Sequence, residues 1–171
     1  MYARRAKASQ IDTVRYEIDM LDFCFGRCME PPGRWEEGDH DVYLECFLVH
    51  YRNLIEFLGG ANHHREDDLS TSKPEEWAEG RVDTNEIRKI RNSVQNLDQS
   101  YYSDISKYIQ HCTAKRHEVD RGWDVNEMFG ELNGILSAFE TAFPRPQGYP
   151  VRNPLTKFQP REKGVFFTQA P

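Results

Sequence analysis

Apolar residues recur every three or four positions along most of the chain. That interval matches the turn of an α-helix and puts the apolar side chains on one face. The clearest case is residues 39–60, which open with aspartates able to cap a helix and close on two glycines. This segment is therefore expected to be a helix with a core face of Leu44, Phe47, Leu48, Tyr51, Leu54, Ile55 and Leu58.

Proline, glycine and polar residues mark where the helices end. The PPG sequence at 31–33 stops the first helix, and DQSYYSD at 98–104 is poor in helix formers, so a break or kink is expected there. Residues 61–83 are expected to be a polar connection with one short turn of helix after its proline. The last helix starts at the capping pair Asp124 and Glu127. Besides residues 39–60, helices are expected at about 11–28, 84–97, 105–118 and 124–143.

The composition changes after Phe143. Residues 144–171 hold most of the prolines of the chain and cannot continue the helix, but they retain apolar side chains. We therefore expect an extended arm that packs on the helices or on a protein partner. A chain of 171 residues is long enough for one domain with a core. The predicted fold is all-α: an up-and-down bundle of four to five helices at residues 1–143, followed by an extended Pro-rich C-terminal arm.

Composition and motifs exclude several function classes. A net charge of −6 argues against a general coat for nucleic acid, although it permits a local basic cleft. No apolar run approaches the ~20 residues that cross a bilayer, and no apolar signal core follows the N-terminus, so a cytoplasmic protein without membrane contact is expected. Cys24 and Cys28 share one side of a helix, but no second pair of metal ligands follows them. We therefore predict no metal and no cofactor.

The same helical reading places polar residues at the margin of the core. In the helix at 39–60, Arg52 and Glu56 lie one turn apart on one flank, where they can pair. Asn53 follows Arg52, and His50 lies on the other flank. Few polar positions remain on this helix, so it is expected to be largely enclosed by its neighbours. The HYRNLIEF sequence at 50–57 is thus predicted to form a polar layer between two helices.

A second polar group falls on the helix expected at 105–118. Arg116 lies in line with its apolar residues, and His111 lies at the edge of that stripe. An arginine aimed at a core needs a carboxylate partner, because an unpaired buried charge costs several kcal/mol. Glu45 and Glu56 on the helix at 39–60 are candidates. Two interpretations stay open: the arginines are structural anchors, or they form a site with the histidines.

The stretches FLVHYRNLIEFLGG and ISKYIQHCTAKRHEVDRGW resemble uncharacterised bacterial helical proteins related to the HEPN superfamily. The shared segment consists here of Ile105, Lys107, His111, Thr113 and Arg116, with Trp123 after it. The resemblance implies a dimer that cleaves RNA without metal, by means of an arginine and a histidine that activate the ribose hydroxyl. The chain departs from that pattern, because the positions that should hold the histidine after Arg52 are Phe57, Leu58 and Gly59.

Two hypotheses follow. The first is a dimeric HEPN-like bundle that binds RNA or a phosphate-bearing ligand; the resemblance implies a ribonuclease in bacterial defence or stress. Its catalytic residues would be Arg52, His111 and Arg116, and its binding residues His50, Asn53 and Glu56. The second is a non-enzymatic interaction module whose arginines are ion-pair anchors. It would meet its partner through residues 144–171 or through a helix face at Gly130 and Gly134, where small side chains predict a close helix contact, internal or across a dimer.

Overall fold

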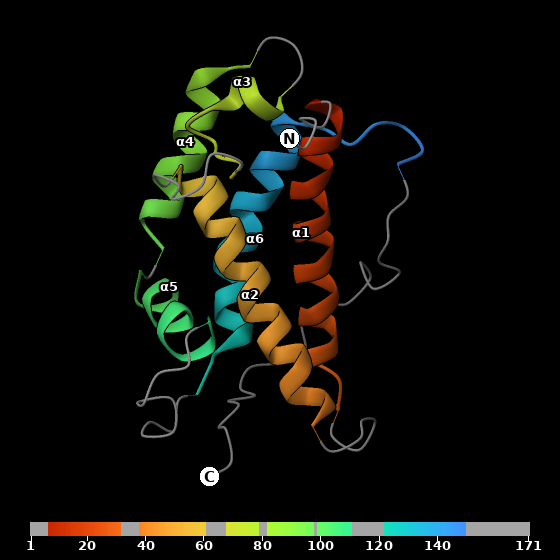
Figure 1. The fold of residues 1–171 in the computed structure, drawn as a ribbon, viewed down its shortest axis with the longest axis vertical. Helices are drawn as coiled ribbons and strands as arrows, with labels where there is room; N and C mark the ends of the chain where they lie inside the picture. The colour runs from red at the N-terminus through yellow and green to blue at the C-terminus, as the bar shows by residue number, and fades with distance from the viewer. Residues whose placement is uncertain are drawn as a thin grey trace, which may run out of the picture.

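The computed structural model describes residues 7–31, 38–60, 68–78, 82–97, 99–110 and 122–149. Within these ranges the regular elements are all helical, which confirms the predicted fold class. They are α1 (Lys7–Cys28), α2 (Asp39–Gly59), α3 (Pro74–Trp77), α4 (Thr84–Gln95), α5 (Gln99–Ile105), the π-helical turn η1 (Ser106–Gln110) and α6 (Val125–Ala142) (Figure 1). No helix in this part of the chain is long and apolar enough to cross a membrane.

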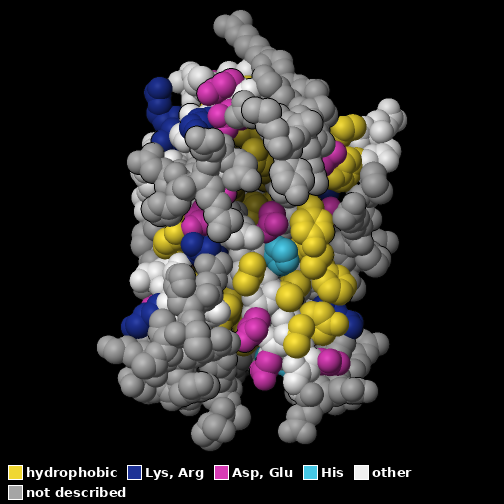
Figure 2. All heavy atoms as spheres, viewed as in Figure 1, with side chains coloured by type: hydrophobic (Ala, Val, Ile, Leu, Met, Phe, Trp, Pro, Cys, Tyr) yellow, Lys and Arg dark blue, Asp and Glu magenta, His cyan; other side chains and the backbone are white. Residues whose placement is uncertain are grey.

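The bundle is built around α2, which contacts α1, α4, α5 and η1 (Figure 1). Helix α6 packs against α1 and α4 and closes the core. The predicted core face of α2 is confirmed, because all seven of its residues are at most 5% exposed. Figure 2 shows an exception to this burial: hydrophobic side chains gather beside a histidine on the face that α1 and α2 present.

The predicted ends of the helices are largely confirmed, except that no aspartate caps α2, whose N-cap is Gly38 without a side-chain hydrogen bond. Helix α2 ends at Gly60, whose positive φ of 66° suits glycine and whose amide donates to carbonyls of the last turn. A Cβ at Gly60 would also lie 2.7 Å from Nε of Arg91. Helix α6 starts as expected, since the carboxylate of Asp124 accepts from the amide of Glu127 at 2.9 Å. These caps satisfy backbone groups that a helix end leaves without partners.

One expectation about local structure was wrong, and a second is met by no contact within the described residues. The break predicted over residues 98–104 is shorter, because α5 already begins at Gln99. Tyr101 and Tyr102 pack partly buried against the core, and this burial outweighs their weak helix propensity. Among the described residues, a Cβ at Gly130 or Gly134 would meet nothing within 4 Å. The described helices therefore make no close contact there, and a contact across a dimer stays a prediction.

The segment after α6 turns back onto α1. Arg145 pairs with Asp19 of α1 and with Glu140 of α6, at 2.7 Å in each case. The guanidinium of Arg15 donates to the carbonyl of Pro144 at 3.0 Å. The ring of Tyr149 lies 5.2 Å from the Arg15 guanidinium and 5.5 Å from that of Arg145. The first residues of the Pro-rich segment are thus held on the bundle by charge and cation–π contacts; residues 150–171 lie outside the described part of the chain.

Candidate functional site

Glu17 of α1 joins two polar residues of α2. One of its carboxylate oxygens, Oε2, lies 2.7 Å from Nδ1 of His50 and accepts from Nδ2 of Asn53 at 3.0 Å. The side chain of His50 is only 12% exposed. Because a carboxylate accepts hydrogen bonds, the His50 nitrogen that faces it carries the proton. The three side chains therefore cross-link α1 to α2 and fix the direction of the Glu17 carboxylate.

Arg52 makes a second group on the opposite flank of α2. Its Nη2 donates to Oε1 of Glu56 at 2.7 Å, and its Nε donates to Oγ of Ser106 at 2.9 Å. Its guanidinium also lies 5.2 Å from the ring centre of Tyr102, whose hydroxyl donates to the same Glu56 oxygen at 2.7 Å. Burial and the hydrogen bond to Glu56 raise the pKa of Tyr102. Arg52 thus ties α2 to α5 and η1.

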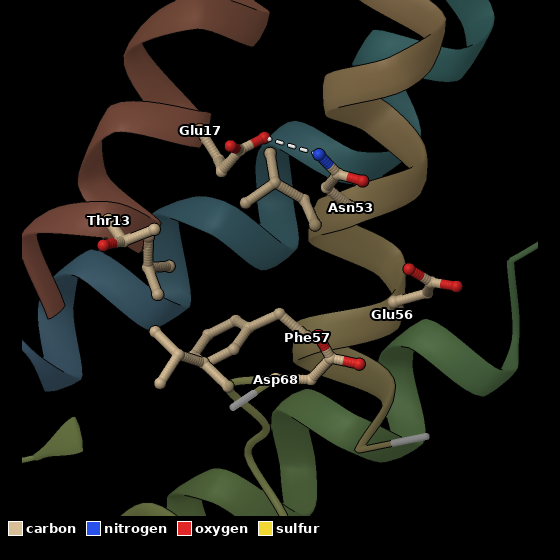
Figure 3. A pocket seen from close by; sticks show the side chains of 9 residues that line it. Thr13, Glu17, Asn53, Glu56, Phe57 and Asp68 are labelled. Atoms are coloured by element: carbon tan, nitrogen blue, oxygen red, sulfur yellow. Dashed lines mark hydrogen bonds between the residues drawn. The ribbon is translucent and has the colours of Figure 1, made fainter. Parts of the chain in front are cut away.

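A pocket of about 310 Å³ opens between these two groups. Its walls come from α1, from α2 and from the chain just before α3 (Figure 3). Figure 3 shows Glu17 and Asn53 joined by their hydrogen bond at one end, with Glu56 and Asp68 farther along the opening. The lining residues are Thr13, Val14, Glu17, Asn53, Leu54, Glu56, Phe57, Asp68 and Leu69.

The pocket combines negative charge with an apolar floor. Glu17, Glu56 and Asp68 supply three carboxylates, of which Glu56 is paired with Arg52 and Glu17 contacts His50. No lysine, arginine or histidine is among the described residues that line the pocket itself. Val14, Leu54, Phe57 and Leu69 supply the apolar surface. Like charges that share a cavity repel an added anion and attract a cation. The arrangement therefore suits a ligand with a positive head and an apolar body.

The structure brings four of the six predicted site residues to one place. Asn53 and Glu56 line the pocket, while His50 and Arg52 bind carboxylates of its wall and are not lining residues themselves. His111 and Arg116 lie outside the described residues, so their predicted roles stay predictions.

Sequence reasoning missed Glu17, Thr13 and Asp68, all of which line the pocket. A partial signal for Glu17 existed, since it is a polar residue on the flank of the apolar stripe of its helix. Which helix that flank would face depends on how the helices pair, and periodicity within one helix does not carry that information. Asp68 lies in a polar stretch without helical periodicity, so the sequence does not assign its side chain to a face.

In the described part of the chain, no group of three His, Cys, Asp or Glu side chains is placed to hold a metal ion. Cys24 and Cys28 are buried, and that burial raises the pKa of each thiol to about 12. A thiolate is the form that attacks electrophiles, and burial disfavours that form in these two thiols.

The fold and the pocket together define the chain as a helical bundle with an acid-lined pocket between its two longest helices. No family model, curated protein or solved structure matches it. The resemblance to HEPN proteins accordingly stays a prediction.

Proposed function

We propose that this chain is a non-enzymatic binding module that takes a cationic group, a primary ammonium or a guanidinium, in the pocket between α1 and α2. The observation that carries this proposal is the lining of the pocket: three carboxylates over an apolar floor, with no basic side chain among the described lining residues. A cation would receive charge-assisted hydrogen bonds from the carboxylates, which are stronger than hydrogen bonds between neutral groups. Its carbon chain would cover the floor.

The hydrogen bonds of Glu17 leave it suited to this role. His50 and Asn53 both approach a single oxygen, Oε2. A carboxylate has two oxygens with about four lone-pair sites, so the group keeps capacity to accept from a ligand. The two contacts hold the carboxylate in place before the ligand arrives, which lowers the entropy lost on binding.

The state of Arg52 argues against a phosphate site on this helix. Its Nε and Nη2 donate to Ser106 and Glu56, and its flat face lies against Tyr102. A phosphate would have to displace these partners and approach the carboxylate of Glu56. Binding or cleavage of RNA would therefore have to depend on His111 and Arg116, the other two catalytic residues of the sequence-based hypothesis.

The size of the pocket limits the ligand. Its volume of about 310 Å³ lies at the small end of the range of ~300–1,000 Å³ typical of ligand pockets. A single amino-acid side chain or a small organic amine fits this size. We expect affinities in the micromolar to millimolar range for such a ligand alone, because small ligands have few atoms to contribute.

Isothermal titration with 2-phenylethylamine, which is protonated at pH 7, tests the proposal against its uncharged analogue 2-phenylethanol. We expect saturable binding of the amine only. Asp68→Asn should weaken binding roughly tenfold, the effect of losing one charge-assisted contact of ~1.4 kcal/mol. Glu131→Gln, an equal charge change at an exposed position on α6, is the matched control and should leave the affinity unchanged. Equal binding of amine and alcohol, or equal losses in the two variants, would refute the proposal.

The RNA hypothesis has its own test, cleavage of RNA in the presence of EDTA. If the binding-module proposal is right, neither the chain nor its Arg52→Ala and His111→Ala variants cleave RNA. Metal-independent cleavage that the native chain performs and a folded His111→Ala variant lacks would replace the proposal with a ribonuclease.

A further inference from the structure

Three thiols gather where α1 packs against α2. Cys24 and Cys28 of α1 are buried, and Cys46 of α2 is half-buried. All three are free cysteines. The thiol of Cys24 lies within hydrogen-bonding reach of the thiol of Cys46, and Cys28 is close enough to interact with both by charge. None of the three lines the pocket between α1 and α2, so the proposed function does not use them.

Ring contacts on both sides of Cys24 fix the register of the two helices at this level. The ring of Phe23 lies 6.1 Å from that of Tyr43, measured between centroids. The ring of Phe25 lies 6.4 Å from that of Phe47 by the same measure. Cys24 therefore sits between two residues that contact α2, opposite the cysteine that directly precedes Phe47. The nearness of the two thiols follows from this packing of aromatic side chains.

Helix geometry decides which pair of thiols can be joined. A disulfide needs two Cβ atoms about 3.5–4.5 Å apart. Cys24 and Cys28 lie one turn apart on the same helix, where Cβ atoms are about 5–6 Å apart, so a bond between them would distort α1. Cys24 and Cys46 belong to different helices and already lie within hydrogen-bonding reach. Rotation about their side-chain bonds can bring these two sulfurs together without unwinding either helix.

We infer that Cys24 and Cys46 form a reversible disulfide when a peroxide oxidises the protein, and that this bond locks α1 to α2. The thiolate of Cys46 attacks one oxygen of the peroxide, the O–O bond breaks, and Cys46 becomes a sulfenic acid. The sulfur of Cys24 then attacks the sulfenic sulfur, the S–O bond breaks, and the leaving hydroxide takes the proton of the Cys24 thiol. Two thiols and one hydrogen peroxide thus give one disulfide and two water molecules.

The two thiols have different parts because they differ in burial. Cys46 is partly accessible and meets the oxidant first. Burial raises the pKa of Cys24 to about 12 and keeps it a thiol until a sulfenic acid forms beside it. The disulfide closes a loop between positions 22 residues apart, which constrains the unfolded chain. We expect oxidation to raise the melting temperature by about 6–12 °C.

Peptide mapping of the full chain after treatment with hydrogen peroxide tests the inference. Trypsin, which cleaves after lysine and arginine, places each thiol in a different peptide. The peptides 16–27, 28–34, 35–52 and 108–115 carry Cys24, Cys28, Cys46 and Cys112, in that order. We expect a linked product of 16–27 and 35–52, lighter by two hydrogen atoms than the sum of its parts, which dithiothreitol separates. The rise in melting temperature should disappear with the same treatment.

Two variants show whether the link depends on the proposed pair. Cys46→Ser should lose the link and the rise in melting temperature. Cys28→Ala is the matched control, since it removes the other neighbouring thiol of the cluster, and it should keep both. Circular dichroism checks that each variant is folded before oxidation.

Several outcomes would overturn the inference. Thiols that stay reduced, or a sulfinic acid at Cys46 beside a free Cys24 thiol, would mean that the two sulfurs do not meet in the folded protein. A link that forms only after unfolding in urea would mean the same. A dimer in non-reducing electrophoresis would assign Cys46 to a bond between two chains. The expected link without a rise in melting temperature would refute the lock between α1 and α2. None of these results bears on the cation pocket, whose ligand titration is a separate experiment.

Discussion

Replacing Arg52 with methionine separates an anchoring role from a ligand-binding role. Methionine keeps most of the apolar stem of the side chain but removes the guanidinium. The substitution deletes the hydrogen bonds to Glu56 and Ser106 and the contact over the ring of Tyr102. Glu56 retains the Tyr102 hydroxyl as a donor, so its carboxylate is left with one partner instead of two.

The size of the effect follows from the burial of the pair. The side chains of Arg52 and Glu56 are 19% and 27% exposed, which is between a surface pair and a buried one. Exposed pairs contribute about 0–1 kcal/mol, and breaking a buried pair costs about 3–5 kcal/mol. We expect a loss of about 2 kcal/mol in the free energy of unfolding, or a fall of about 4–8 °C in melting temperature for a chain of this length.

Urea denaturation of the native chain, Arg52→Met and the control Arg88→Met measures this loss. Arg88 is an exposed arginine on α4, and its replacement should change the unfolding free energy by less than about 0.5 kcal/mol. If Arg52→Met is as stable as the control, Arg52 does not anchor α2 to α5 and η1. The guanidinium would then be available for a ligand such as phosphate on α2.

Three further predictions concern other parts of the bundle. Arg145→Ala should lower the unfolding free energy by about 3 kcal/mol in urea denaturation, because it leaves the Asp19 side chain, 8% exposed, without its cation; a loss below about 1 kcal/mol would contradict this. Burial and the nearby Glu127 raise the pKa of Tyr101 to about 12, above the value of about 10 for an unfolded chain. Its contribution to stability should therefore be complete below about pH 10 and lost as the pH rises to about 12, and Tyr101→Phe should lose less stability over that interval; identical pH profiles would refute this. Gly134→Ala should raise the unfolding free energy by about 0.5–1 kcal/mol, since the added methyl group meets nothing within 4 Å in a helix; a decrease would reveal a contact on that face.

The sequence was sufficient to predict those parts of the fold that depend on a single local rule, such as helix periodicity or capping. The stripes of α1, α2 and α6 were predictable because burying one face of a helix imposes a period near 3.6 residues whatever the neighbours are. The helix ends at Gly60 and Asp124 were predictable because caps are local. At Tyr101 and Tyr102, helix propensity and burial oppose each other. The low helix propensity predicted a break, but the packing of the two rings against the core stabilises a helix.

The candidate site was predictable only in part, for the same reason. Arg52 and Glu56 lie one turn apart, so their pairing follows from helix geometry. The contact of Glu17 with His50 joins residues 33 positions apart and needs the pairing of α1 with α2. The clamp of Arg145 on Asp19 likewise depends on where the chain goes after α6, and proline content predicts only that the helix stops.

A titration of ¹⁵N-labelled protein followed by two-dimensional NMR distinguishes a cation pocket from a phosphate site, with 2-phenylethylamine in one series and inorganic phosphate in the other. If the pocket takes a cation, the amine shifts the amide signals of Asn53, Phe57 and Leu69 in a saturable manner, and phosphate leaves them in place. Saturable shifts with phosphate at Arg52 and Ser106, together with no response to the amine, would contradict the claim and restore the phosphate site.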